Sequence, residues 1–313
     1  MSQVQRLLLL ASPTMVHTPA FERARALALA ADLPLHIVEF AYVSTLTVAG
    51  LFAPEQMKQA RGNYLNTHRQ WLEQLAEQTR KQGIEVTCEV VLVKHPYEEI
   101  LRYVNEMSLA LIIKDAEKES VLKRSFFTPL DWQLLRDCPV PVHLVTEARN
   151  PWPRRVLAIV DVLRGEDQDL VLNDQIIDAA VKLAEQCKAK LDLLHVYDWS
   201  IIYMSDLGLD EVSSAAGHYK ALGNAQREVF SALAERHGVP AEHRHFVEGI
   251  PLRAICTFAA QDLTDVIVMG TVQHRGLDKY LGSTAEHLLH RAPCSVLAIK
   301  PTDESSPYKN DVL

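Results

Sequence analysis

A glycine-punctuated stretch, VIVMGTVQHRGLDKYLGSTAEHLL at residues 266–289, carries the residue types best suited to binding chemistry. Its apolar beginning ends at Gly270, and Gly282, Ser283 and Thr284 open an amphipathic run. The free N–H groups and the positive dipole end of a helix start receive anions, and glycine lets a ligand come close to the backbone. The stretch therefore predicts a phosphate-binding turn between a strand and a helix.

The same residue types also suit a purely structural role. Ser283-Thr284-Ala285-Glu286 is a capping box, in which the serine accepts a hydrogen bond from the third helical N–H and Glu286 reaches back. Asp161 follows another apolar run and offers an acceptor for a ribose hydroxyl or a base amine. An aspartate after a strand is more often a turn residue than a ligand contact. Taken alone, the local patterns therefore favour capping and turn formation.

The elements that must position these residues occur twice along the chain. QRLLLLAS at 5–12 matches RRVLAIVD at 154–161, and LALIIKD at 109–115 matches TDVIVMG at 264–270. Matches of this kind run element by element through both halves, which indicates a tandem duplication. We therefore predict a first domain at residues 1–148, a second domain at 153–302 and a polar tail at 303–313.

Each half alternates short β-branched and leucine-rich runs with longer amphipathic stretches. This alternation is typical of a parallel sheet with crossover helices, and near-continuous apolar runs suit strands buried on both faces. The predicted fold class is α/β, with two tandem doubly wound five-stranded parallel-sheet (Rossmann-like) domains. The predicted helices cover residues 19–31, 55–82, 96–107, 173–188, 209–237 and 250–261.

A ligand position follows from this fold class. In open α/β sheets, ligands bind beyond the carboxyl ends of the strands, at the point where the strand order reverses. If the first and fourth strands of the second half flank that point, Asp161 and Gly270 border one crevice. A hydrogen-bond acceptor on one wall and an anion site on the other suit a nucleotide, which carries both hydroxyl or amine donors and phosphates. The prediction places phosphates over Gly270, Gly282, Ser283 and Thr284, and the base or ribose near Asp161 and Val196.

The first half departs from the second at the corresponding positions. Ser12 replaces Asp161, Asp115 replaces Gly270 and Phe127 replaces Gly282, while Pro129 follows the capping Thr128. Proline has no N–H to offer an anion, a phenylalanine blocks close backbone approach, and an aspartate adds negative charge. We therefore predict that the first half retains the helix start and has lost the nucleotide site.

The stretches VIVMGT and GSTAEHLLHRAPCSVLAIK, together with FVEGIP and Asp161, resemble the universal stress protein family. FFTPLDWQLLRDCPVPVHLV of the first half is similar to tandem members of that family, so the resemblance covers nearly the whole chain. It implies ATP as the ligand of the second domain, an intramolecular pseudo-dimer of the two domains, and a homodimer as a further assembly. The cofactor-binding residues that it implies are Val160, Asp161, Val196, Met269, Gly270, Gly282, Ser283 and Thr284.

The chain departs from the family's ATP-binding pattern, which is Gly, two residues, Gly, nine residues, then Gly followed by Ser or Thr. Gln273 stands at the second glycine, and only eight residues separate it from Gly282, although Gly276 offers some flexibility. Two functions therefore stay open. One is a stress-response protein that binds ATP or a related nucleotide. The other is a stress-response scaffold or binding protein whose crevice holds an apolar metabolite or lipid, or no ligand.

Other function classes are not favoured by the sequence. A net charge of −8 argues against binding to nucleic acid, and no apolar run approaches the roughly 18 residues of a membrane span. The first apolar run has neither a cationic leader nor a small-residue cleavage site, so we expect a cytoplasmic protein.

We expect neither a metal site nor a catalytic centre. The pairs His243 with His245 and His287 with His290 have no third ligand at a metal-site spacing. A nucleophile elbow, a Walker loop and a His-Glu-x-x-His motif are all missing from the sequence, so the protein is at most a slow nucleotidase.

Overall fold

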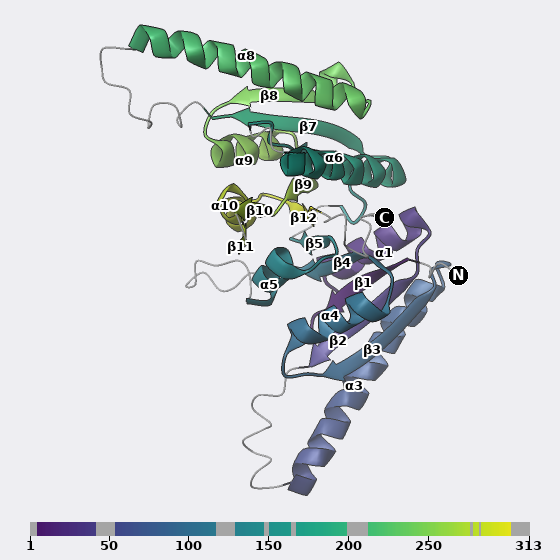
Figure 1. The fold of residues 1–313 in the computed structure, drawn as a ribbon. Helices are drawn as coiled ribbons and strands as arrows, with labels where there is room; N and C mark the ends of the chain where they lie inside the picture. Colours follow the sequence, from purple (N-terminus) through teal and green to yellow (C-terminus); the bar gives the residue numbers. More distant parts are fainter. Residues whose placement is uncertain are drawn as a thin grey trace. The chain divides into compact units, whose positions relative to one another are not determined.

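The computed structural model describes residues 5–41, 54–116, 129–146, 150–163, 167–198, 212–275, 278–281 and 283–301. The chain divides into two compact units, with the boundary between Trp152 and Pro153, and these are called the first and second domains below (Figure 1). None of the helices in the described part of the chain is long and apolar enough to cross a membrane.

The first domain holds a parallel sheet with the strand order β3-β2-β1-β4-β5 (Figure 1). The order reverses between β1 and β4. Its strands are β1 (Arg6–Ala11), β2 (Leu35–Ala41), β3 (Val86–Leu92), β4 (Leu109–Asp115) and β5 (Val142–Val145). Its helices are α1 (Pro19–Ala31), α3 (Pro54–Arg80), α4 (Pro96–Glu106) and α5 (Pro129–Asp137).

The second domain repeats this arrangement with the strand order β12-β9-β6-β7-β8, again parallel throughout. Its strands are β6 (Arg155–Ile159), β7 (Lys190–Tyr197), β8 (Arg244–Glu248), β9 (Val266–Gly270) and β12 (Ser295–Ile299). Its helices are α6 (Asp167–Cys187), α8 (Val212–Arg236), η2 (Ala241–His243), α9 (Pro251–Gln261) and α10 (Ser283–Arg291). The predicted fold of two doubly wound five-stranded domains is confirmed.

Local sequence explains why these elements form. The central strands β1, β4, β6 and β9 are built almost entirely from buried apolar residues, as expected for parallel strands covered by helices on both faces. Helix α1 begins after Thr18, whose side chain accepts a hydrogen bond from the N–H of Phe21, and Pro19 fills its first turn. It ends at Asp32, which adopts the left-handed conformation.

Two segments differ from the sequence-based prediction. Helix α6 begins at Asp167, whereas the sequence predicted a start at residue 173. The prediction was wrong because the apolar run Leu170 to Leu172 in the first turns hides the helical periodicity. The predicted loop after Gly270 instead contains an antiparallel hairpin of β10 (Val272–Arg275) and β11 (Asp278–Leu281). Gly276 directly after Arg275 is a hairpin signal that the loop prediction did not use.

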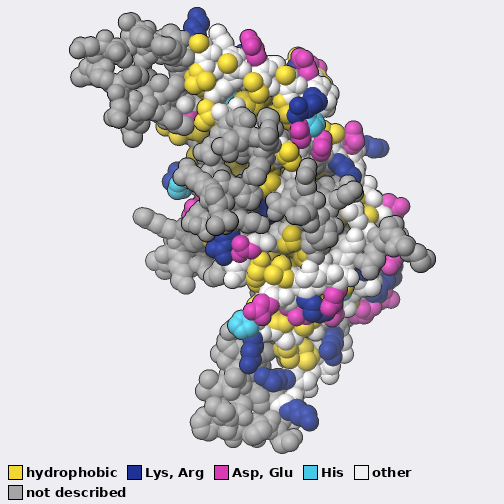
Figure 2. Space-filling model, viewed as in Figure 1, with side chains coloured by type: hydrophobic (Ala, Val, Ile, Leu, Met, Phe, Trp, Pro, Cys, Tyr) yellow, Lys and Arg dark blue, Asp and Glu magenta, His cyan; other side chains and the backbone are white. Residues whose placement is uncertain are grey.

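The described surface carries charges of both signs. On the face shown in Figure 2, Lys and Arg side chains occur among Asp and Glu side chains in both domains. On α3 of the first domain, Arg80 pairs with Glu73. Exposed pairs of this kind contribute little stability and mainly keep the surface hydrated.

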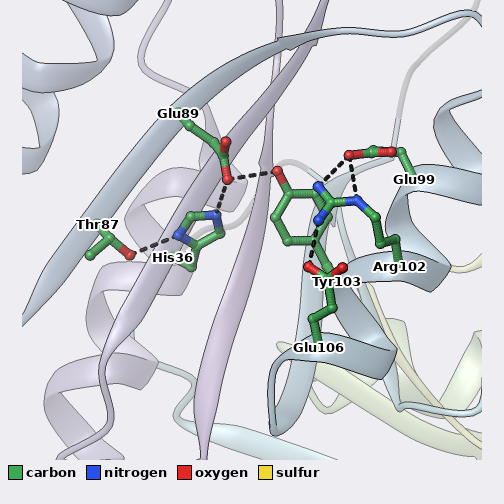
Figure 3. Close-up of polar contacts among 7 residues, drawn as sticks. All are labelled: His36, Thr87, Glu89, Glu99, Arg102, Tyr103 and Glu106. Atoms are coloured by element: carbon green, nitrogen blue, oxygen red, sulfur yellow. Dashed lines mark hydrogen bonds and ion pairs between the residues drawn. The ribbon is translucent and has the colours of Figure 1, made fainter.

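A polar cluster joins β2, β3 and α4 in the first domain (Figure 3). The Nδ1 of His36 lies 2.7 Å from Thr87 Oγ1, and its Nε2 lies 3.2 Å from Glu89 Oε1. The hydroxyl of Tyr103 donates to the same carboxylate oxygen at 2.7 Å. The buried imidazole is therefore fully hydrogen-bonded in its neutral form.

The second domain holds the corresponding cluster with acid and base exchanged. Asp192 takes the place of His36 when LPLHIVEF at 33–40 is matched to AKLDLLHV at 189–196. Its Oδ1 lies 3.1 Å from His243 Nδ1 and 2.9 Å from His245 Nε2. Burial favours a raised pKa for Asp192, but hydrogen bonds from both histidines and a lysine lower it below its ordinary value. No group of His, Cys, Asp or Glu among the described residues could hold a metal ion.

The polar cluster around His36 is expected to make the first domain sensitive to mild acid. Burial lowers the pKa of His36, although the Glu89 carboxylate opposes the shift. The unfolded chain therefore takes up a proton below about pH 6.5 that the folded domain does not, so stability present above that pH is lost as the pH falls. We expect His36→Gln to lose less stability than the wild type between pH 7 and pH 5, measured by urea unfolding.

His95 provides a matched control for this experiment, because its side chain is exposed and makes no hydrogen bond to the start of α4. The His95→Gln variant should follow the wild-type pH dependence. A His36→Gln variant with the same slope as the wild type would show that His36 is not the group responsible.

Candidate functional site

The crevice of the second domain lies where the strand order reverses. Strand β6 pairs with β9 on one side, from Val156 opposite Val266 to Ile159 opposite Met269, and with β7 on the other. The first and fourth strands of this domain are thus neighbours, as expected. Gly270 is the last residue of β9, and Asp161 follows the end of β6 by two residues.

Asp161 is exposed and forms a turn. Its Oδ1 accepts a hydrogen bond from the N–H of Leu163 at 2.9 Å, which is the pattern of an Asx turn. Its backbone is held by Asn173 of α6, which lies beneath it. The N–H of Asp161 donates to Asn173 Oδ1 at 3.1 Å, and its carbonyl accepts from Asn173 Nδ2 at 2.7 Å. The carboxylate therefore extends from a turn whose backbone is fixed. This turn and the neighbouring strand end at Gly270 are called the corner of the second domain below.

Sequence reasoning missed Asn173. The signal that could have found it is its spacing, because Asn173 shares one buried face of α6 with Ile176, Ile177 and Ala180. A polar residue at i, with apolar residues at i+3, i+4 and i+7, faces the core and must hydrogen-bond to a buried polar group. What it satisfies depends on tertiary structure, which the spacing does not give.

The residue before Asp161 is anchored from the neighbouring strand. The N–H of Val160 donates to the carbonyl of Leu194 at 3.1 Å, and its carbonyl lies 3.1 Å from the Nδ1 of the buried His195. Because a carbonyl only accepts, the Nδ1 of His195 carries a proton. The other ring nitrogen lies 3.2 Å from Gln226 Oε1. Both nitrogens of His195 are therefore engaged within the domain.

The three apolar residues predicted to contact the nucleotide differ in their burial. Val160 and Met269 are buried, whereas Val196 on β7 is only half-buried. A ligand above the sheet would therefore meet the side chain of Val196 more readily than those of Val160 and Met269.

Gly270 lies against α6. A Cβ added at this position would lie 2.8 Å from Leu172 Cδ2 and 3.3 Å from Ile176 Cδ1. A contact below 3 Å is too short for carbon atoms, so a side chain here would push the helix or its leucine away. Close packing between helix and strand thus accounts for the glycine, with or without a ligand.

The remaining predicted contacts belong to the start of α10. This helix begins at Ser283, and Glu286 lies in its first turn. Gly282 lies outside the described residues, and the side chains of Ser283 and Thr284 do so as well. Gln273, at the position of the family's second glycine, is paired with Tyr280 in the hairpin. The backbone at Gln273 is therefore part of a ladder rather than of an irregular loop.

The first domain builds the same corner with different groups. The N–H of Thr14 lies 3.5 Å from Ser12 Oγ, which repeats the turn of Asp161 and Leu163. At the end of β4, Asp115 Oδ1 accepts a hydrogen bond from the N–H of Ala20 at 2.9 Å, in the first turn of α1. A carboxylate is favourable there because the N-terminus of a helix carries partial positive charge. The first domain thus supplies its own anion to this helix start.

A buried ion pair completes the first domain's corner. Lys114 Nζ of β4 lies 3.1 Å from Asp131 Oδ1 in the first turn of α5, and both side chains are buried. Met269 and Glu286 occupy the corresponding positions of the second domain, where the methionine is buried and the glutamate is exposed. Phe127 and Thr128 lie outside the described residues.

Comparisons with known proteins cover both domains. The model of the Universal stress protein family matches residues 6–146 and 154–300. Universal stress protein E of Escherichia coli K12 is 27% identical over 321 residues, which cover 99% of this chain and 98% of that protein. Universal stress protein E of Photorhabdus laumondii is 28% identical over 318 residues, 99% of each chain.

A solved structure shares the tandem arrangement. It is the crystal structure of a putative universal stress protein from Pseudomonas aeruginosa UCBPP-PA14, which is 25% identical. The match covers 95% of this chain and 94% of that one, with a TM-score of 0.70. Because the family model matches well over half of the residues, the chain belongs to the universal stress protein family and carries two of its domains in tandem.

Proposed function

We propose that this protein is a stress-response protein that binds ATP or a related nucleotide in the crevice of its second domain. The phosphates would lie over the backbone of Gly270 and the start of α10, with the ribose or base near Asp161 and Val196. Gly282, Ser283 and Thr284 would supply the N–H groups at the helix start. The protein would act by binding rather than by catalysis.

The observation that carries this proposal is the asymmetry between the two strand-end corners. The first domain uses Asp115 to satisfy the start of α1, and it buries Lys114 against Asp131. A phosphate approaching that corner would meet a fixed carboxylate, which repels it. The second domain has a glycine and a methionine at the two strand positions. At these two strand positions, which the structure describes, the second domain therefore has no carboxylate in the place of Asp115.

The turn at Asp161 does not use up its carboxylate. An ionised carboxyl group has two oxygens and about four acceptor sites, of which the N–H of Leu163 occupies one. The side chain can therefore hold its turn and accept from the hydroxyls of a ribose. Its exposure supports this role, because a ligand can reach the carboxylate from solvent.

The contacts of Gly270 and Gln273 favour a second candidate function. Gly270 is accounted for by its packing against Leu172, and Gln273 belongs to a paired strand at the position where the family pattern has glycine. Under this alternative the protein is a stress-response scaffold whose crevice holds an apolar metabolite or lipid, or no ligand. The two candidates differ in one measurable property, which is saturable binding of ATP.

Catalysis has little support at this crevice. His195 contacts the backbone at the end of this crevice, but it is buried and both of its nitrogens are engaged. A general base must reach the proton that it removes. We therefore expect any ATP hydrolysis to be slow compared with nucleotide exchange.

The packing role of Gly270 can be tested through stability. We expect Gly270→Ala to destabilise the protein by about 1 to 3 kcal/mol, because the added methyl group overlaps Leu172. The double variant Gly270→Ala with Leu172→Ala should lose less stability than the sum of the two single variants, since the second change makes room for the first. Urea unfolding of all four proteins measures this coupling, and additive losses would contradict the contact.

Binding can be tested by calorimetric titration of ATP. We expect the wild type to bind one ATP per chain, and Gly282→Phe to lose binding. Asp161→Ala should weaken binding roughly tenfold to a hundredfold, because a hydrogen bond to a charged group contributes about 1.5 to 3 kcal/mol.

Ser12→Ala is the matched control for this titration, since Ser12 forms the equivalent turn in the first domain. It should leave the affinity unchanged. Equal affinities for the wild type, Gly282→Phe and Asp161→Ala, or a stoichiometry of two ATP per chain, would count against the proposed site.

A further inference from the structure

Both polar atoms of the Asn173 side chain bind the backbone of a single residue, Asp161. Asn173 is only 3% exposed, its Oδ1 accepts from the N–H of Asp161, and its Nδ2 donates to the carbonyl of the same residue. Because a backbone N–H only donates and a carbonyl only accepts, this pairing also fixes the orientation of the amide. Asn173 thus offers Asp161 the two hydrogen bonds that a neighbouring strand would offer.

Such a substitute is needed because Asp161 has left the sheet. The pairing of β6 with β9 ends at Ile159, opposite Met269. Backbone groups beyond that point must find other partners, or their loss of hydration destabilises the corner. Leu194 and His195 hold Val160, and Asn173 holds Asp161. The backbone that carries the exposed carboxylate is therefore held by groups from buried positions.

The same turn of α6 reaches both walls of the crevice. Leu172 lies against the bare backbone of Gly270 at the end of β9, and Asn173 binds Asp161 beyond the end of β6. The helix packs across both strands (Figure 1). Two consecutive residues of one rigid element thus fix the positions of the two walls.

In the described part of the first domain, no buried side chain holds the backbone of Ser12 as Asn173 holds that of Asp161. There, α1 is tied to the other wall, where the N–H of Ala20 binds Asp115. In the described part of the first domain, no side chain other than that of Thr14 hydrogen-bonds to Ser12, and none holds its backbone. Among the residues that the structure describes, the two hydrogen bonds from one buried side chain thus occur at the turn of Asp161 and not at the turn of Ser12.

We infer that Asn173 is a positioning residue, which holds the Asp161 carboxylate in the orientation that binds the ribose or base of a nucleotide. This inference rests on the proposed function. The ligand class is a nucleotide with free ribose hydroxyls, because a fixed carboxylate selects hydrogen-bond donors at a defined place. Asn173 itself lies beneath the corner and acts only through Asp161.

The Asn173→Asp variant tests this role with a pH profile. An ionised carboxylate at 173 accepts from the N–H of Asp161 but cannot donate to its carbonyl, whereas a protonated carboxyl group can do both. Burial and the nearby Asp161 raise the pKa of a carboxyl group placed there, so it should titrate above the usual range of aspartate. We expect ATP to bind this variant at least about tenfold more weakly than the wild type at pH 8. The difference should largely disappear near pH 5.

Two further variants separate positioning from general damage. Asn173→Ala removes both hydrogen bonds, so its ATP affinity should be about tenfold below that of the wild type at every pH. Asp174→Asn alters the next residue of α6, which pairs with His237 away from the corner, and should bind ATP as the wild type does. Circular dichroism at each pH verifies that all variants are folded.

The outcomes distinguish this inference from the proposed function. Failure of the wild type to bind ATP overturns the proposed function, and with it any role of Asn173 toward a ligand. ATP binding that is unaffected by Asn173→Ala, or an Asn173→Asp affinity that follows the wild type from pH 8 to pH 5, overturns the role of Asn173 alone. Hydrogen exchange of the Asp161 amide in ligand-free protein should quicken in Asn173→Ala, and unchanged exchange would contradict the clamp.

Discussion

The close approach of α6 to the end of β9 is the contact on which the second domain's crevice depends. It is possible because Gly270 has no side chain, so Leu172 can occupy the space that a Cβ would need. The next residue of the helix then comes within hydrogen-bond distance of Asp161. A larger residue at 270 would disturb the wall that carries it and also the opposite wall, through the helix that both share.

The first domain satisfies the start of a helix at its corner with its own carboxylate. Helices that start beside the carboxyl ends of parallel strands expose N–H groups that need an acceptor. The first domain provides one from its own β4, where Asp115 binds the first turn of α1, and it buries a lysine against α5. These internal groups stabilise the corner, and under the proposed function they also keep anions away from it. A duplicated fold can therefore retain one domain for stability while the other remains available for a ligand.

Apolar patterning predicted the larger features because burial decides them. The runs at β1, β4, β6 and β9 identified central parallel strands, and the repeat of these runs identified the duplication. The hairpin of β10 and β11 was missed because its short strands carry little apolar signal. The partners of Asp161 and Gly270 were missed for a different reason. Asn173 and Leu172 reach them only when α6 crosses back over the sheet, and a single sequence does not give that register.

The exchange of acid and base between the clusters of His36 and Asp192 has a consequence for folding. Chains that contain two copies of one fold are prone to assemble strands from the wrong copy. A sheet that paired β2 with β8 would set His36 against the histidines of the second domain, and one that paired β7 with β3 would set Asp192 against Glu89. His36 and Asp192 are buried, so each would then lie without the partner of opposite polarity that satisfies it, which is costly. The reversed polarity therefore disfavours pairing between a strand of one copy and a strand of the other.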